Sequence, residues 1–422
     1  MGSTVHSSGR GSGRVVVIGA GAAGLMAGIQ AAREGAEVTI LESMSHLGAK
    51  ILVSGGGRCN VTNEDMRAVW FNSASPPFVE TALAGFDLDD SLWFFNDLGV
   101  PLKVEPEMGK LFPVSDSART VLNALIAAVD GSGAELLKES PVTSLERGAD
   151  GWRVTTPHDV YEAEAVILCT GGLALPKSGS TGAGYAFASQ LGHRVNRTAP
   201  ALSPLLADPA VHADLSGVTL PVRLELRRGS ISLARYTGSF LFTHGGYSGP
   251  AALNLSRHVA LAEPGAGVYV RFVPEVEDGD EAKFQDWLLE TRGRQGLSAA
   301  LASLVPRRVA QMITEVAGAP GHAPLGRLSG SERKTLFTSL LDQRLPVSGV
   351  AGYPKAEATA GGVCLDEVDA ETMMSRLAPG FFLAGEILDV DGCLGGYNFQ
   401  WAWTTGALAG RAAARFARQP AA

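Results

Sequence analysis

Residues 15–42 read VVVIGAGAAGLMAGIQAAREGAEVTILE, and this stretch decides the fold of the chain. Residues 15–18 form a short apolar run typical of a buried strand, and residues 37–41 form another strand-like run. Between them, residues 22–34 carry alanine, leucine, methionine and isoleucine at helical spacing. The pattern therefore predicts a strand, a helix and a second strand that lies parallel to the first.

A G-x-G-x-x-G motif lies where the first strand runs into the helix. A lone motif of this kind is weak evidence in a chain with 52 glycines, but here it follows a strand, opens a helix and is completed by Glu42 after the next strand. The first glycine permits a tight turn, the second lets the backbone approach a pyrophosphate, and the third lets helix and strand pack closely. Glu42 is expected to accept hydrogen bonds from ribose hydroxyls. The expected ligand contacts are Gly19, Gly21, Ala22, Ala23, Gly24 and Glu42. A glycine turn without a ligand is the alternative.

The amino-acid composition limits the kinds of molecule that the chain is expected to bind. The chain has 422 residues, 18% of them charged, and its formal net charge of -8 argues against a nucleic-acid surface and favours a small-molecule substrate. The uncharged residues 15–32 are explained by the glycine motif better than by a membrane span. Four cysteines without a C-x-x-C pair indicate a reduced, cytoplasmic setting. The eight histidines show no metal-ligand spacing, and the sequence leaves the oligomeric state open.

The pattern changes along the chain and predicts an interrupted nucleotide-binding domain. Apolar and charged residues alternate over residues 222–227, which is typical of a strand, whereas residues 281–341 interleave polar and apolar residues as helices do. After Lys355, short apolar strands and glycine turns resume. The predicted parts are a disordered leader (1–13), a nucleotide-binding domain (14–198 and 352–422), a β-rich insertion (199–275) and a helical insertion (276–351).

Three further clusters favour FAD over NAD as the bound dinucleotide. The first is the glycine-rich run 48–63, the second is Thr-Gly-Gly after the strand at residues 165–169, and the third is Gly-Glu followed by more glycines at residues 385–398. Their N–H groups, amides and a helix N-terminus suit the ribityl chain and the N1 and O2 atoms of a flavin. The expected FAD contacts are Lys50, Gly57, Arg58, Asn60, Thr170, Gly171, Gly172, Gly385, Glu386, Gly395, Gly396, Tyr397 and Asn398. A flexible loop and a plain strand-to-helix connection are the alternatives.

Two further positions are candidates for chemistry. His244 precedes a glycine turn and is the candidate proton donor to substrate, although an isolated histidine is often structural. Gly361, in the run Thr-Ala-Gly-Gly at residues 359–362, is expected to present its N–H group to the flavin or to a substrate oxygen. A tight structural turn is the alternative there.

Several of these strings, among them SGGGRCNVTN, CTGGLALPKSGSTGAGY and AGEILDVDGCLGGYNFQ, are long and specific. Over residues 15–411 the chain resembles a bacterial family of NAD(P)/FAD-dependent oxidoreductases that includes aminoacetone-oxidase-like and bile-acid-dehydroxylation-associated flavoproteins. The resemblance implies an α/β fold: a Rossmann-like, doubly wound, three-layer FAD-binding domain with an inserted β-barrel-like and helical domain. It also implies that Arg58, Asn60, Gly172, Gly385, Glu386 and Asn398 surround the part of FAD beyond its ADP moiety.

The resulting hypothesis is an FAD-dependent oxidoreductase that passes hydride through a non-covalently bound flavin. We expect NAD(P)H, or an amine or hydroxyl substrate, to reduce the flavin. An activated alkene, a quinone-like acceptor or oxygen would then accept the hydride. Because a second G-x-G-x-x-G motif is absent, the nicotinamide would bind only transiently. The alternatives are an oxygen-using amine or aminoketone oxidase without nicotinamide, a non-catalytic flavin-binding module and an NAD-only dehydrogenase.

Overall fold

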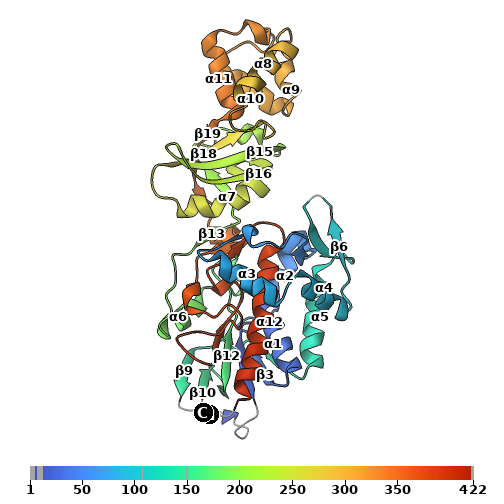
Figure 1. The fold of residues 1–422 in the computed structure, drawn as a ribbon, viewed down its shortest axis with the longest axis vertical. Helices are drawn as coiled ribbons and strands as arrows, with labels where there is room; N and C mark the ends of the chain where they lie inside the picture. Colours follow the sequence, from blue (N-terminus) through green and yellow to red (C-terminus); the bar gives the residue numbers. More distant parts are fainter. Residues whose placement is uncertain (1–4, 7–12, 107, 149–150, 420–422) are drawn as a thin grey trace. The chain divides into compact units, whose positions relative to one another are not determined.

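The computed structural model describes residues 5–6, 13–106, 108–148 and 151–419. The chain divides into two compact units, here called unit 1 (residues 1–198 and 358–422) and unit 2 (residues 199–357) (Figure 1). Within the predicted leader, residues 1–4 and 7–12 lie outside the described residues, whereas β1 (Val5–His6) pairs parallel with β11 (Val160–Ala163). The four-part division from the sequence stays a prediction.

Unit 1 is built on a five-stranded parallel sheet in the order β22-β12-β2-β3-β8. Its strands are β22 (Phe381–Leu383), β12 (Ala165–Leu168), β2 (Arg14–Ile18), β3 (Glu37–Leu41) and β8 (Glu135–Leu137). β2 has β3 on one side and β12 on the other, so the order of the strands reverses at β2. Ligands bind outside the carboxyl ends of the strands at such a reversal. The predicted α/β fold is confirmed.

A helical layer covers one face of this sheet, and a second sheet covers the other. Phe381 and Phe382 are neighbours in β22 and therefore point to opposite faces. Phe382 packs against Phe416 of α12 (Tyr397–Ala417), with 6.2 Å between ring centroids. Phe381 packs against Trp152 of β10 (Gly151–Thr155) at 5.6 Å. β10 belongs to the sheet β1-β11-β10-β9, which ends with β9 (Ser144–Gly148).

The first helix and the last helix of unit 1 pack together through glycines. In α12, a Cβ atom at Gly406 would lie 2.5 Å from the carbonyl oxygen of Ala23, and one at Gly410 would lie 2.3 Å from that of Ala27, both in α1 (Ala22–Arg33). Such close approach of two backbones is open only to glycine. The expected helix at residues 400–413 is part of the longer helix α12. Its contact with α1 joins the N-terminal and C-terminal segments of unit 1.

The remaining elements of unit 1 surround this core. The helices are α2 (Ala49–Val53), α3 (Pro76–Gly85), α4 (Leu88–Asp97), α5 (Ala118–Gly131) and α6 (Ala183–Gln190). A small sheet has the order β4-β7-β6, with β4 (Thr62–Asn63), β6 (Leu102–Glu105) and β7 (Lys110–Pro113). β5 (Phe71–Asn72) pairs with β23 (Asp391–Gly392), just before α12.

Unit 2 contains a seven-stranded antiparallel sheet in the order β19-β18-β15-β16-β17-β14-β20. The strands are β14 (Leu205–Ala207), β15 (Thr219–Arg228), β16 (Ile231–Thr243), β17 (Gly246–Ser248), β18 (Ala266–Arg271), β19 (Gln343–Leu345) and β20 (Val347–Val350). The two edge strands are successive parts of one segment, joined only by Pro346. The sheet therefore curls until its edges meet, as expected for a barrel-like insertion. α7 (Pro250–Leu261) packs on its strands.

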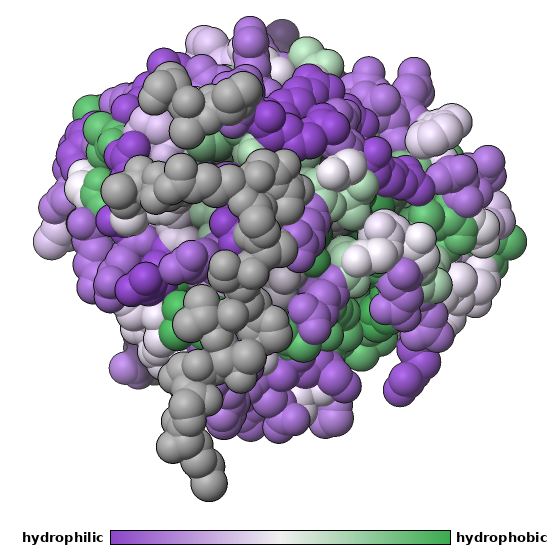
Figure 2. Space-filling view, turned by 90° about the horizontal axis from the view of Figure 1, so that it is seen from below, coloured by the Kyte–Doolittle hydropathy of each residue, from purple (hydrophilic) through white to green (hydrophobic). Residues whose placement is uncertain are grey.

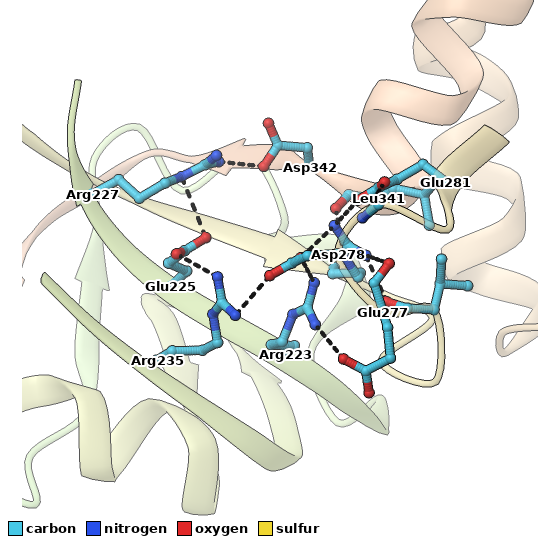
Figure 3. Close-up of polar contacts among 12 residues, drawn as sticks. Arg223, Glu225, Arg227, Arg235, Glu277, Asp278, Glu281, Leu341 and Asp342 are labelled. Carbon is cyan, nitrogen blue, oxygen red and sulfur yellow. Dashed lines mark hydrogen bonds and ion pairs between the residues drawn. The ribbon is translucent and has the colours of Figure 1, made fainter. Parts of the chain in front are cut away.

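Four helices complete unit 2 and share one hydrophobic core with the sheet. They are α8 (Glu281–Arg292), α9 (Leu297–Ala302), α10 (Arg307–Ala317) and α11 (Gly330–Leu341). Where strands meet helices, Asp278 forms ion pairs with Arg223 at 2.5 Å and Arg235 at 2.7 Å (Figure 3). It also pairs with Arg271 at 3.2 Å. Because a buried arginine needs a paired acid, these contacts fix the segment before α8 to the sheet.

Candidate dinucleotide site of unit 1

The glycine motif places the N-terminus of α1 at the carboxyl edge of the sheet. A Cβ atom at Gly19 would lie 2.6 Å from the carbonyl oxygen of Cys169, and one at Gly24 would lie 1.8 Å from that of Gly19, so the packing of the protein itself requires both glycines. Gly21, the exposed N-cap of α1, differs: beyond its chain neighbours, no described heavy atom lies within 4 Å of its Cβ position. This open space in front of free helix N–H groups suits a diphosphate. Ala22 and Ala23 begin the helix.

Glu42 follows β3 and is fixed beside the glycine turn. Its Oε2 accepts a hydrogen bond from the N–H of Ala20 at 2.8 Å, and its Oε1 accepts one from the N–H of Met44 at 2.8 Å. A Cβ atom at Gly179, in the loop after β12, would lie 3.8 Å from Oε1. Each carboxylate oxygen has more than one acceptor site, so ribose hydroxyls remain possible donors. Ribose binding by Glu42 stays a prediction.

Glu386 and Lys50, 336 residues apart in sequence, form an ion pair at the carboxyl end of β22. Lys50 in α2 donates from Nζ to Oε2 of Glu386 at 2.5 Å, and the two side chains are 24% and 19% exposed. Glu386 lies in the single turn Gly385–Ile387 that follows β22. Its other oxygen, Oε1, is buried and has no hydrogen-bond partner among the described residues. A buried acceptor of this kind needs a donor, which a ligand can supply.

The Thr-Gly-Gly turn after β12 lies against the same carboxylate. A Cβ atom at Gly172 would lie 3.1 Å from Oε1 of Glu386 and 2.4 Å from Oγ1 of Thr359. Thr359 fixes the turn, because its Oγ1 accepts hydrogen bonds from the N–H groups of Leu173 at 2.8 Å and Ala174 at 3.0 Å. Gly172 therefore allows the side chain of Thr359 to pack closely against the turn, next to the unpartnered oxygen.

Thr170, Gly171 and Gly361 have different surroundings. Oγ1 of Thr170 is buried and lacks a hydrogen-bond partner among the described residues. Gly171 has φ +70°, and its Cβ position is 2.8 Å from Oγ of Ser180. Gly361 has φ +80°, and its Cβ position is 2.2 Å from the carbonyl oxygen of Arg197, which explains this glycine by its turn alone. Contact of Gly361 with a flavin stays a prediction.

The glycine-rich run after α2 contributes open backbone and one buried amide. Gly57 is exposed with φ +87°, and only the carbonyl oxygen of Leu52, at 3.9 Å, lies near its Cβ position. Asn60 is 9% exposed, and its Oδ1 has no hydrogen-bond partner among the described residues. Arg58 instead pairs with Glu105 at 3.1 Å and lies 4.0 Å above the ring of Phe112. Its charge is already engaged by β6 and β7, so its contact with FAD stays a prediction.

The start of α12 faces the same buried amide. A Cβ atom at Gly396, the N-cap of α12, would lie 3.0 Å from Oδ1 of Asn60. Asn398 is used within the turn, because its amide exchanges hydrogen bonds of 2.9 Å with the N–H and the carbonyl of Gly392. Tyr397 stacks on Trp70 with 5.8 Å between centroids, and burial raises the pKa of its hydroxyl. Tyr397 and Asn398 thus shape the turn, and ligand contacts by them stay predictions.

Two residues that position this edge were missed from the sequence. Nδ2 of Asn63 donates to the carbonyl oxygen of Gly395 at 2.8 Å, and Oγ1 of Thr405 accepts from the N–H of Gly385 at 2.9 Å. Asn63 stands in the run RCNVTN, whose second asparagine was the available signal. Thr405 is fully buried within an apolar helix, and a polar residue at such a position is the corresponding signal.

The donor set of unit 1 fits FAD. Oδ1 of Asn60, Oγ1 of Thr170 and Oε1 of Glu386 are buried and lack partners among the described residues, and FAD carries hydroxyl and N–H groups along its length. Gly21 leaves room for phosphates at a helix N-terminus. His244, by contrast, lies in unit 2, exposed in the turn between β16 and β17. Its catalytic role stays a prediction.

The fold and the site together define an FAD-dependent oxidoreductase built on a Rossmann-type nucleotide-binding domain. Residues 13–412 match the model described as the HI0933-like protein Rossmann domain, and the chain belongs to this family. The predicted cofactor and enzyme class are thereby confirmed, whereas the electron donor and the substrate are not.

Three relatives cover nearly the whole chain. A 3-dehydro-bile acid delta(4,6)-reductase of Clostridium scindens is 35% identical over 406 residues, which cover 95% of this chain and 99% of the relative. A ribosomal RNA dihydrouridine synthase of Escherichia coli is 32% identical, with 92% and 95% covered. The synthase of the same name from Haemophilus influenzae is 33% identical, with 92% and 96% covered. Because two of these relatives act on RNA by name, the exclusion of nucleic acid stays a prediction.

The described part of the chain lacks features of a membrane span and of a metal site. None of its helices has both the length and the apolar character needed to cross a bilayer. The same residues contain no group of three or more His, Cys, Asp or Glu side chains that could hold a metal ion. One face of the molecule is mostly hydrophilic with smaller hydrophobic areas (Figure 2). The cytoplasmic location stays a prediction.

Proposed function

We propose that this protein reduces a carbon–carbon double bond conjugated to a carbonyl group, with FAD as hydride carrier and NAD(P)H as electron donor. In the overall reaction, a hydride adds to one alkene carbon and a proton to the other, while NAD(P)H becomes NAD(P)⁺. The observation that carries the proposal is a set of three buried polar atoms of unit 1, on Asn60, Thr170 and Glu386, which lack partners among the described residues.

The relatives support this reaction by what their names share. A delta(4,6)-reductase of a 3-dehydro bile acid saturates double bonds conjugated to a ketone, and a dihydrouridine synthase saturates a pyrimidine double bond conjugated to a carbonyl. The substrates differ in size, but the bond that is reduced has the same electronic character. Bound FAD supplies a centre that accepts two electrons from a nicotinamide and returns them as hydride.

The residues of unit 1 bind and orient the cofactor in this proposal. The N-terminus of α1, open at Gly21, holds the diphosphate, and Glu42 accepts hydrogen bonds from the adenosine ribose. The N-terminus of α12, at Gly396 beside Asn60, favours negative charge on the ligand through its N–H groups. Both binding elements are N-termini of helices that pack against strands of the unit 1 sheet, so the fold sets their positions.

The charge distribution between the two units is compatible with RNA as a substrate. Unit 1 contains 19 Lys and Arg against 28 Asp and Glu, whereas unit 2 contains 16 against 15. The acidic excess of the chain therefore belongs to unit 1, and the net charge of -8 does not describe unit 2. We propose a small organic enone as the substrate, with uridine in RNA as the second candidate, which the two synthase relatives favour.

An anaerobic experiment separates the candidates. The yellow protein is first offered NADH, NADPH or an amine as reductant. The reduced protein is then mixed with a 3-oxo-Δ4 steroid acid, a uridine-containing RNA oligonucleotide or oxygen. We expect one nicotinamide to bleach the flavin and the steroid to restore its colour. If only RNA restored the flavin colour, the substrate would be a nucleic acid. Bleaching by an amine but by neither nicotinamide would indicate an oxidase and contradict the proposal.

The same assay tests the proton donor. We expect His244→Asn to slow re-oxidation by the alkene while reduction by the nicotinamide is unchanged, because only alkene reduction consumes a proton at carbon. His322→Asn, another exposed histidine of unit 2, is the matched control. Equal re-oxidation rates in both variants would show that His244 is not the proton donor.

A further inference from the structure

Lys50 and Glu386 occupy fixed positions at the carboxyl edge of unit 1. Lys50 belongs to α2, whose N-cap Gly48 has φ +64° and a Cβ position only 2.4 Å from Leu122. On the other side, the turn that carries Glu386 is tied to α12, since the N–H of Gly385 donates to Thr405. Neither group depends on a flexible loop, so the ion pair between them is built into the fold.

The pair is asymmetric, because Lys50 uses only one oxygen of the carboxylate. Nζ of Lys50 bonds Oε2 at 2.5 Å, while Oε1 is buried and unpartnered among the described residues. Gly172 and Thr359 border this oxygen: a Cβ atom at Gly172 would lie 3.1 Å from Oε1 and 2.4 Å from Oγ1 of Thr359. A carboxylate that is held by one oxygen, while its other oxygen is buried and unpartnered, can accept a hydrogen bond from a ligand there.

The order of the strands indicates which half of the ligand is concerned. Glu42 follows β3 and Glu386 follows β22, and β2 and β12 lie between these strands. Three strand spacings separate the two acids by roughly 14 Å. A ligand whose adenosine lies at Glu42 therefore reaches Glu386 with its other, flavin-bearing half.

We infer that Lys50 is a positioning residue that acts through Glu386: it holds the carboxylate so that Oε1 accepts a hydrogen bond from the flavin-bearing half of FAD. The inference rests on the proposed cofactor function. Without Lys50, the carboxylate loses its charge partner and its fixed orientation. Binding of the ADP half, which Glu42 and the α1 N-terminus govern, is independent of the pair.

The test measures two affinities in the apoprotein: FAD by fluorescence titration and ADP by calorimetry. We expect Glu386→Gln and Lys50→Met each to weaken FAD binding about tenfold or more, as loss of a charge-assisted hydrogen bond does, and to leave ADP binding unchanged. Lys50→Arg should restore most of the affinity. Lys50→Met in the Glu386→Gln background should add no further loss, because its route of action is already gone.

Arg153→Met is the matched control, since it breaks an exposed ion pair of unit 1, with Glu162 at 3.1 Å. FAD affinity in Lys50→Met equal to that of this control would overturn the inference. So would a loss that extends equally to ADP, or a double variant whose losses add, because Lys50 would then act on the fold or independently of Glu386. If the wild type binds ADP but not FAD, the proposed cofactor function fails instead.

Discussion

A substitution at Gly21 should affect FAD binding much more than it affects the stability of the fold. Its backbone has φ −75° and ψ −169°, which any residue adopts, and beyond its chain neighbours no described atom lies within 4 Å of its Cβ position. Gly21→Ala should therefore lower the stability of the apoprotein by no more than about 1 kcal/mol, the difference between glycine and alanine at an N-cap. For a unit of this size the unfolding midpoint should fall by at most about 4 °C.

The effect on FAD should be far larger. A methyl group in front of the α1 N-terminus holds the diphosphate away from two N–H donors, each worth about 1.5–3 kcal/mol to a charged acceptor. The affinity should fall by about 10²- to 10⁴-fold. Calorimetric unfolding of the apoprotein and fluorescence titration with FAD measure the two effects. Gly24→Ala is the contrast, because its Cβ would lie 1.8 Å from a backbone oxygen and should destabilise the apoprotein itself. Wild-type FAD affinity in Gly21→Ala would refute the reasoning.

Two further predictions concern stability. Gly410→Ala should lower the unfolding midpoint of unit 1 by about 2–6 °C, because its Cβ would lie 2.3 Å from a backbone oxygen of α1 and overpacking outweighs the gain in helix propensity; Gly131→Ala, whose Cβ position is open, should not lower it, and a higher midpoint in Gly410→Ala would contradict the close crossing. Burial raises the pKa of Asp278, but the charges of Arg223 and two other arginines outweigh it and lower the pKa overall. The ion pairs should therefore stabilise unit 2 above the ordinary aspartate pKa of about 4 and lose their contribution as the pH falls below it. Unfolding midpoints measured between neutral and acidic pH should fall less with pH in Asp278→Asn than in the exposed control Asp286→Asn, and parallel curves would exclude the role of Asp278.

The sequence predicted the parallel core because its signals are local. The strand ending at Ile18, the glycines at the start of α1 and Glu42 after β3 all lie within one short stretch, and the backbone geometry they require is independent of the rest of the chain. The alternation in β15 predicted a strand for the same reason, since one face of its sheet is buried.

The side-chain partners at the site were beyond sequence reasoning. Lys50 and Glu386 are 336 residues apart, and their pairing follows only from the order of the strands. Arg58 pairs with Glu105 of β6 and lies over Phe112 of β7, contacts that its residue type did not predict, and its contact with the flavin stays a prediction. An arginine suits a cofactor and an acidic hairpin equally well, so its residue type alone does not decide between them.

The interruption of unit 1 by unit 2 has a consequence for synthesis. Unit 2 is one uninterrupted run, so its sheet is complete once the segment through Val350 has left the ribosome. Unit 1 is completed later, because β22 and α12 are synthesised after unit 2. Until they are present, the face of α1 that α12 covers stays exposed. Domains generally fold as units during translation. A premature stop just before α12 would therefore release a folded insertion carried on an unfinished nucleotide domain, with the apolar surface of α1 exposed to chaperones and proteases.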